Sequence, residues 1–355
     1  MLSLIEIEAE GDPGCLFLPT QKIETSWVDP AKRHAFLALD PGFLSIDTVC
    51  EFPIYVYNSA RDRFVLLKAV DLPITQRHLE QIRSTRHGPV FVPRDYARTL
   101  TTYAADNLKL LAGNTSVSAS TRSRQVYSVS RALFAGAFSE SCDDQELEGI
   151  CHRVTEAMVT LLDSGSEALR HLILAQSHDP AVYVHSLNVC ILGTSLFDYL
   201  HSKCGKEERL SVAQGFLLHD IGKTDISPEI WTKPGKLTPD EYEHVKQHPV
   251  HGFKRVKRME NLTERTQRIV LEHHEHCDGS GYPSGLTCDG ISVEAQICAI
   301  VETFEDLTSE RPYHAPLPVF QALRLMQIEG RDKLDVEIFK GFIHFFRSLS
   351  GSSNH

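Results

Sequence analysis

The chain has 355 residues, of which 42% are hydrophobic and 23% charged, a length and composition typical of a two-domain globular protein. Its formal net charge of −11 argues against a surface for nucleic acid or for anionic membranes. The sequence has no run of 18 apolar residues that would predict a membrane span, and no basic start that would predict a signal peptide. Its nine cysteines include no C-x-x-C pair. We therefore expect a cytoplasmic protein with reduced thiols.

The first predicted elements are short strands. Residues 52–57 and 63–68 are rich in β-branched and aromatic side chains and flank the five residues 58–62, which predicts a β-hairpin. Residues 89–93 predict a third short strand, held between two prolines. This part of the chain is therefore expected to contain a small sheet.

A short helix is predicted in the same region. Thr75 precedes residues 76–82 and suits the N-cap position, where its side-chain oxygen can accept a backbone N–H. We find neither a glycine-rich phosphate loop nor a cluster of ligand residues here. By elimination, we expect residues 1–112 to form a small α+β module with a sensory, regulatory or dimerising role and a regulatory partner that the sequence does not identify.

The pattern becomes helical after a small, polar stretch. Residues 113–122 predict a linker, and residues 123–350 predict an all-helical domain punctuated by Gly and Pro, which makes the fold class α+β overall. Ser141 and Asp144 suggest a capping box at the start of one amphipathic helix. The apolar stripe of that helix is Leu147, Ile150, Val154, Met158 and Leu161.

Histidine is the compositional anomaly, with 18 in the chain and eleven of them between His171 and His276. Such crowding is typical of a metal or acid–base site. His185 ends the apolar face of a predicted helix, where a histidine is more often a satisfied core residue than a ligand. The further histidine clusters downstream favour the ligand interpretation.

The first of these clusters is His219-Asp220-Ile221-Gly222-Lys223, which follows an apolar helical segment. Gly222 suits the position just past a helix end. At such an end, His219 and Asp220 can converge on one pair of metal ions, with the aspartate bridging both. Lys223 would then lie close enough to hold a phosphate as a point charge.

Two more clusters follow. His244 and His248 are one helical turn apart and can face the same side. His273 and His274 diverge by about 100° on a helix, so each can bind one of two neighbouring metals, or one can orient the other.

A stiff turn, Asp-Gly-Ser-Gly-Tyr-Pro, spans residues 278–283. Gly279 and Gly281 permit backbone angles that other residues resist. Tyr282 offers a flat ring and a hydroxyl to the base or phosphate of a nucleotide. The alternative interpretation is a surface turn with a packed tyrosine.

Together, the His-Asp pair, the His-His pair and this turn resemble the HD-GYP family, hydrolases of the bacterial messenger cyclic di-GMP, over residues 177–341. The resemblance implies two divalent metal ions, iron or manganese, with Asp220 as the catalytic bridging carboxylate. Imidazole donors with few carboxylates also suit transition metals better than magnesium or calcium. The implied ligands are His185, His219, Asp220, His248, His273, His274 and Glu302.

The chain departs from the family pattern at several positions. The family usually has Asp where this chain has Glu302 and Glu305, and often a basic residue where it has His314. Ala181 stands where some members have a Glu that holds a third metal, so the site resembles the two-metal version. The substrate contacts implied by the resemblance are Lys223, Tyr282, Glu305, Arg311 and His314.

These motifs imply a metal-dependent phosphodiesterase that hydrolyses cyclic di-GMP through a hydroxide bridging the metals, with Asp220 and Lys223 as catalytic residues and an N-terminal control module. Two alternatives stay open: a signalling protein that binds nucleotide or metal with little or no turnover, and a phosphohydrolase of another nucleotide. We further expect no nucleic-acid partner and no membrane insertion, and we count a homodimer among the candidate assemblies.

Overall fold

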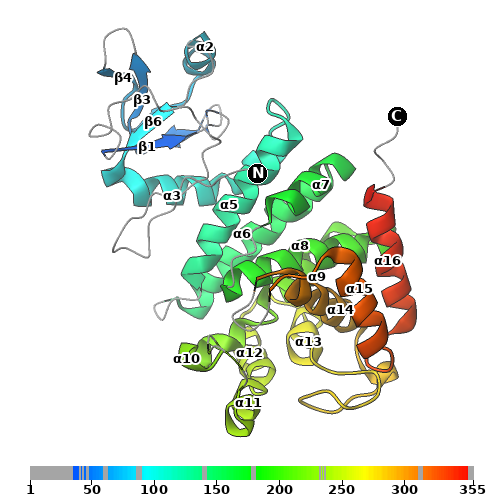
Figure 1. Ribbon diagram of the computed structural model, residues 1–355. Helices are drawn as coiled ribbons and strands as arrows, with labels where there is room; N and C mark the ends of the chain where they lie inside the picture. Colours follow the sequence, from blue (N-terminus) through cyan, green and yellow to red (C-terminus); the bar gives the residue numbers. More distant parts are fainter. Residues whose placement is uncertain are drawn as a thin grey trace. The chain divides into compact units, whose positions relative to one another are not determined.

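The computed structural model describes residues 35–350 except 40, 42–43, 45–47, 59–62, 85–89, 138–141, 177–180, 232, 234, 236 and 311–314. The chain divides into two compact units, residues 1–133 and 134–355. Strands occur among the described residues of the first unit, and helices make up the second (Figure 1). The predicted α+β class is therefore confirmed, whereas the predicted linker at residues 113–122 stays a prediction.

The first unit contains a four-stranded antiparallel sheet with the strand order β1-β6-β3-β4. Its strands are β1 (Phe36–Leu39), β6 (Val90–Pro93), β3 (Ile54–Asn58) and β4 (Arg63–Lys68). The predicted hairpin of β3 and β4 and the predicted third strand β6 are confirmed. Strand β1 and the small sheet of β2 (Val49–Cys50) and β5 (Leu72–Pro73) were not predicted, because so few residues carry little periodicity.

The helices of this unit lie between β5 and β6 or follow β6 along the chain. They are α2 (Gln76–Ser84), α3 (Ala97–Asp106), α4 (Leu108–Gly113) and most of α5 (Ala119–Ala137), with a 3-10 turn η3 (Arg94–Tyr96). The predicted cap of α2 is confirmed, because Thr75 Oγ1 accepts the backbone N–H of His78 at 3.4 Å.

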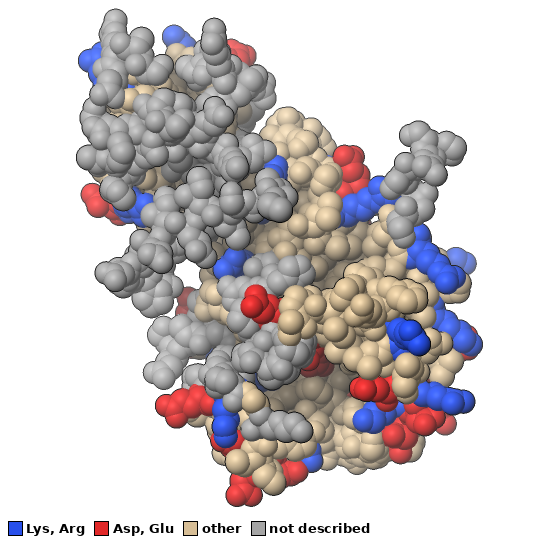
Figure 2. Space-filling view, viewed as in Figure 1, with Lys and Arg blue, Asp and Glu red and all other residues tan. Residues whose placement is uncertain are grey.

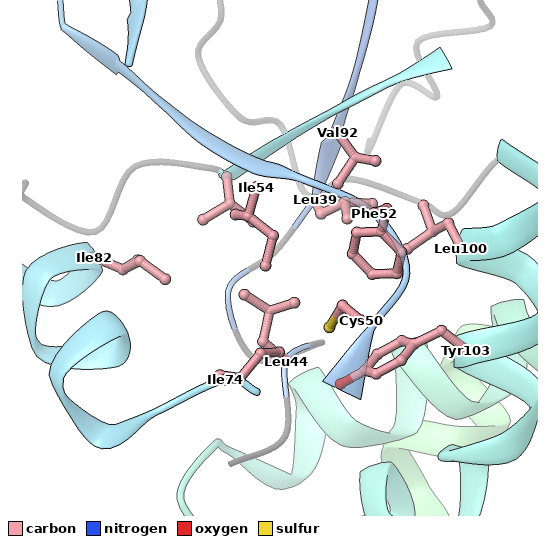
Figure 3. Close-up of a cluster of buried hydrophobic side chains, with 11 residues drawn as sticks. Leu39, Leu44, Cys50, Phe52, Ile54, Ile74, Ile82, Val92, Leu100 and Tyr103 are labelled. Carbon is pink, nitrogen blue, oxygen red and sulfur yellow. The ribbon is translucent and has the colours of Figure 1, made fainter. Parts of the chain in front are cut away.

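An apolar cluster fills the first unit, with side chains from the sheet, from α2 and from α3 pointing toward one another (Figure 3). Phe52 and Tyr103 pack edge to face, with ring centroids 5.4 Å apart. Lys68 is buried beside them, and its ammonium donates hydrogen bonds to Cys50 O (2.7 Å) and Phe52 O (3.2 Å). Among the described residues of this unit, no three ligand side chains converge.

The regular elements among the described residues of the second unit are helices. Its helices are α6 (Asp144–Leu162), α7 (Ser166–Ala175), α8 (Val182–Leu200), α9 (Lys206–Leu218), α10 (Pro228–Trp231), α11 (Pro239–Val245), α12 (His248–Val256), α13 (Glu264–Glu272), α14 (Val293–Thr308), α15 (Val319–Glu329) and α16 (Val336–Ser350), with 3-10 turns η4 (Ile221–Asp225) and η5 (Cys288–Gly290). The predicted stripe of α6 is buried, as expected. The predicted capping box is wrong, because Asp143 caps α6 by accepting from Glu146 N at 2.8 Å; Ser141 lies outside the described residues.

Helix α8 runs through the interior of the second unit and packs against α9 and α14 (Figure 1). Every residue from Val184 to Phe197 is buried, so the helix is covered on all sides along this stretch and not only on the one face that we predicted. A helix that is apolar nearly all round gains most from such a position. His185, in its first turn, is thereby carried into the core.

Acidic and basic side chains alternate over the helical unit on the face shown in Figure 2, in contrast to the continuous basic surface that nucleic-acid binding uses. Within the described residues, no helix combines the length and the apolar character that a membrane span requires.

Candidate metal centre

His219 and Asp220 lie in the turn between α9 and η4, and both are fully buried. The helix ends there as predicted, but the role predicted for Gly222 is wrong, since its φ angle is not positive. A Cβ at Gly222 would lie 2.0 Å from His248 O. Glycine is needed here because η4 touches the start of α12, which brings the His-Asp pair close to His248.

Backbone carbonyls orient three of the histidine rings. Each carbonyl belongs to the residue three positions earlier, near a helix end, where carbonyls lack partners within the helix. Because a carbonyl oxygen only accepts, each Nδ1 carries the proton and each Nε2 presents its lone pair to the centre. The Nδ1–O distances are 2.8 Å from His219 to Phe216, 2.7 Å from His248 to Val245 and 2.9 Å from His273 to Val270.

A buried carboxylate orients the fourth ring. His185 Nδ1 donates a short hydrogen bond to Glu305 Oε2. Glu305 Oε1 in turn accepts from Asn188 Nδ2 at 2.9 Å and from Ser309 Oγ at 2.7 Å. We predicted Glu305 as a substrate contact, but in the structure it lies behind His185. Carboxylates in this position hold metal-binding histidines in place.

The donor atoms converge in two groups. Those of the first group, Asp220, His248, His273 and His274, lie within 4.8 Å of one another. The same holds for the second group, His185, His219, Asp220 and Glu302. Asp220 belongs to both groups, so the predicted set of seven ligands can hold two ions with one shared carboxylate. His244, which we considered as a neighbour of His248, is exposed and outside both groups.

Two buried atoms of this cluster have no hydrogen-bond partner, namely His219 Nε2 and Asp220 Oδ1. Nε2 of His248 and Nε2 of His273 face each other at 3.1 Å. Buried polar atoms are nearly always satisfied, so lone pairs that point at one another mark a place for a cation. The donor set therefore fits a pair of metal ions.

The protonation states suit metal binding as well. Burial lowers the pKa of His219 to about 4 and also lowers the pKa values of His248 and His273, so these rings are neutral at pH 7. Burial by itself would raise the pKa of Asp220, but the charge of Lys223 is the largest opposing influence, and the pKa lies well below its usual value. Neutral imidazoles around an ionised carboxylate are what a divalent transition metal requires.

The remaining predicted site residues are the ligand Glu302 and the substrate contacts Lys223, Arg311 and His314. Glu302, on α14, has Oε1 3.6 Å from His274 Nε2. Lys223 Nζ is 2.6 Å from Asp220 Oδ2, so its ammonium stands at the shared carboxylate. Arg311 and His314 lie outside the described residues.

The turn at residues 278–283 stands beside the cluster and carries Tyr282. The ring of Tyr282 stacks on that of His274, with centroids 4.8 Å apart, and Lys246 Nζ lies 5.8 Å from its centroid. Gly279 has φ +77°, as predicted, but Gly281 is required for a different reason, because a Cβ there would lie 2.3 Å from His276 N.

Sequence analysis missed the residues that hold this turn. Glu275 accepts the backbone N–H groups of Ser284 (2.6 Å) and Leu286 (2.8 Å). Cys277 and Cys288 are joined by a disulfide, so the expectation of reduced thiols is wrong for this pair, while the other six described cysteines are free. C-x-x-C spacing does not reveal this bond, because its two cysteines are eleven positions apart.

Comparisons with known proteins agree with this geometry. Residues 174–338 match the HD domain family. The cyclic di-GMP phosphodiesterase PA4108 of Pseudomonas aeruginosa is 34% identical over 176 residues, which are 50% of this chain and 42% of that one. A cyclic di-GMP phosphodiesterase of Thermotoga maritima is 37% identical over 134 residues, which are 38% of this chain and 36% of that one. The 3'3'-cGAMP-specific phosphodiesterase 3 of Vibrio cholerae is 35% identical over 132 residues, which are 37% of this chain and 28% of that one.

This chain thus spans less than half the length of each of these relatives. Among solved structures, the HDG"Y"P protein Bd1817 of Bdellovibrio bacteriovorus has a similar fold, with a TM-score of 0.61 and 18% identity over 88% of this chain and 99% of that chain. The fold and the motifs define the helical part of the chain as an HD domain. Within that class, its motifs resemble those of the HD-GYP family.

Proposed function

We propose that this protein is a metal-dependent phosphodiesterase that hydrolyses cyclic di-GMP. The observation that carries the proposal is the pair of ligand groups that share Asp220. A phosphodiester is anionic and reacts slowly with water, and a two-metal site answers both difficulties. The relatives named as cyclic di-GMP phosphodiesterases support this choice of substrate.

The ligands of the two ions are the seven residues of the two groups, and the ions are iron or manganese. When bound, such ions supply Lewis acidity and lower the pKa of a water molecule. Asp220 holds the two sites together, and Glu305 keeps the ring of His185 turned toward them. The donors support a divalent transition metal rather than magnesium or calcium, since five of the seven are imidazoles.

The substrate lies against Lys223 and Tyr282. The ammonium of Lys223 lies at the carboxylate of Asp220. A phosphate bound at the metals would lie at the same carboxylate, so the ammonium can turn from Asp220 to a phosphate oxygen over a short distance. Burial first, and the charge of Glu302 second, raise the pKa of Tyr282, so its hydroxyl keeps the proton that it can donate. Arg311 and His314 complete the proposed substrate contacts.

The N-terminal module, residues 1–112, is proposed to control the helical domain, either through a partner or through a homodimer. We propose a cytoplasmic location, because six described cysteines are free thiols, as a reducing compartment favours.

The test is turnover by the purified full chain. The chain is loaded anaerobically with Fe(II) or Mn(II), its metal content is counted, and cyclic di-GMP is followed by chromatography to the linear dinucleotide or to GMP. We expect about two ions per chain and hydrolysis that chelation abolishes. The 3'3' cyclic GMP–AMP of the Vibrio relatives serves as the competing substrate. Metal binding and tight nucleotide binding without turnover would instead identify a binding protein.

A further inference from the structure

The bonded pair Cys277–Cys288 differs from the other cysteines of the described chain. Both of its residues are partly exposed, whereas five of the six free cysteines are buried. Burial raises the pKa of the thiols of Cys151, Cys190 and Cys298, which keeps them protonated and unreactive. Among the described cysteines, thiol chemistry with small molecules is therefore directed to the 277–288 pair and to the partly exposed Cys204.

The pair closes the turn that carries Tyr282. Cys277 follows His274 by three residues, and Cys288 N donates to Cys277 O at 3.3 Å. Asp278 and Thr287, the residues next to the two cysteines within the closed loop, form an isolated β-bridge. The disulfide thus ties together both ends of residues 278–287, whose tyrosine stacks on a predicted metal ligand.

The turn also has other supports. Glu275 accepts two backbone N–H groups from it, and Tyr282 N donates to His274 O at 3.1 Å. Asp335 Oδ2 lies 3.7 Å from Cys288 Sγ and offers an acceptor to that residue as a free thiol. The bond can therefore open without removing everything that shapes the turn.

We propose that Cys277–Cys288 is a reversible thiol–disulfide exchange site for small thiols and disulfides of the glutathione class, and that its state sets how firmly the turn holds the nucleotide. The second half of this proposal rests on the proposed function. In the reduction, one small thiolate attacks a cysteine sulfur and forms a mixed disulfide, and a second thiolate then displaces the protein. The net change consumes the protein disulfide and two small thiols and yields two cysteine thiols and one small disulfide, a two-electron transfer.

Reduction leaves the metal ligands in place, because their helices and carbonyl partners do not involve the bond. It gives residues 278–287 more conformations, and ordering them again on binding weakens affinity. We therefore expect the reduced form to have a KM and a Kd about 3- to 10-fold higher, with kcat and metal content unchanged.

The exchange is tested on the full chain at graded ratios of reduced to oxidised glutathione. Thiols are trapped with a maleimide, and peptides are measured by mass spectrometry, with Cys204→Ser as the control that removes the other partly exposed thiol among the described cysteines. We expect the pair to pass from bonded to alkylated across the series. A pair that stays bonded, or stays alkylated, at every ratio would overturn the exchange site.

The consequence is tested by calorimetric binding of cyclic di-GMP and by kinetics on both trapped forms. The double variant Cys277→Ser/Cys288→Ser should match the reduced form and lose all response to glutathione. Equal Kd and KM in the oxidised and reduced wild-type chain would refute the control of the turn, whether or not the variant folds. If no form binds or hydrolyses cyclic di-GMP, the proposed function and the control of the turn both fail, while the glutathione series still decides the exchange site.

Discussion

The two units treat buried polar groups in opposite ways. In the first unit, Lys68 is only 2% exposed, and its ammonium donates to two backbone carbonyls. In the second, His219 and Asp220 are fully buried, yet Nε2 of one and Oδ1 of the other lack hydrogen-bond partners. An unsatisfied buried polar atom costs about 1–3 kcal/mol. The hydrogen bonds of Lys68 are complete within the chain, whereas His219 and Asp220 leave two buried atoms that a cation could satisfy, as the proposed metal centre requires.

Asp220→Ala should have the largest effect, because it removes the one carboxylate common to both ligand groups. We expect turnover to fall by roughly 10³-fold or more, together with loss of bound metal. Elemental analysis and product chromatography on the same preparation measure both quantities. Full metal content with full turnover would mean that the His-Asp pair is part of the core, as Lys68 is.

Glu305→Gln should come next. It keeps the size of the side chain but removes the charge that orients His185. Residues behind metal ligands typically contribute about 10- to 100-fold to metal affinity, and we expect a loss in that range. Ser309→Ala is the matched control, since it removes one donor to the same carboxylate and leaves the contact with His185. Equal metal affinity in both variants would return Glu305 to the role of substrate contact.

Glu302 allows a finer test, because it stands where the HD-GYP family usually has Asp. Its carboxylate is within 4.8 Å of the other donors of its group. If it binds metal, Glu302→Asp should keep or raise activity, and Glu302→Ala should lose it. Activity and metal content are measured for all three side chains, and the same values in each would remove Glu302 from the site.

Acidification should destabilise the metal-free chain. The pKa of His219 is about 4 in the folded state against about 6.5 when unfolded, so between these values the unfolded chain binds more protons. The free energy of unfolding should therefore fall as the pH drops from 6.5 toward 4, by roughly 3 kcal/mol from His219 alone. Urea unfolding at several pH values measures this. A flat profile in the wild-type chain would contradict neutral burial of His219.

The sequence predicted the elements whose signals are local. The hairpin of β3 and β4, the cap at Thr75 and the stripe of α6 depend on neighbouring residues, and all three are confirmed. The histidine motifs also indicated which residues would meet, because each motif is short and distinctive. The ligand roles themselves await the metal measurements above.

What the sequence did not predict depends on residues far apart in the chain. Glu305 orients His185 across 120 positions, and no local pattern encodes that contact. Gly222 is needed where η4 approaches α12 closely. In the sequence alone, the same glycine resembles the end of a helix. The Cys277–Cys288 bond depends on how the turn closes. Each of these features is a matter of packing between elements, and it becomes visible only in three dimensions.

Removal of the N-terminal module should have the smallest effect on the metal centre, because no ligand group forms among the described residues of the first unit. A chain that begins at Ser120 keeps α5 apart from Ala119, and one that begins at Cys142 lacks α5 but keeps the Asp143 cap of α6. We expect the longer of the two to retain its metals and measurable turnover, with altered regulation. If it folds by circular dichroism but loses its metals, the predicted boundary at residues 113–122 is wrong. If the chain that begins at Cys142 also retains its metals, the helical unit assembles its metal centre without α5. That result would assign α5 to the control module.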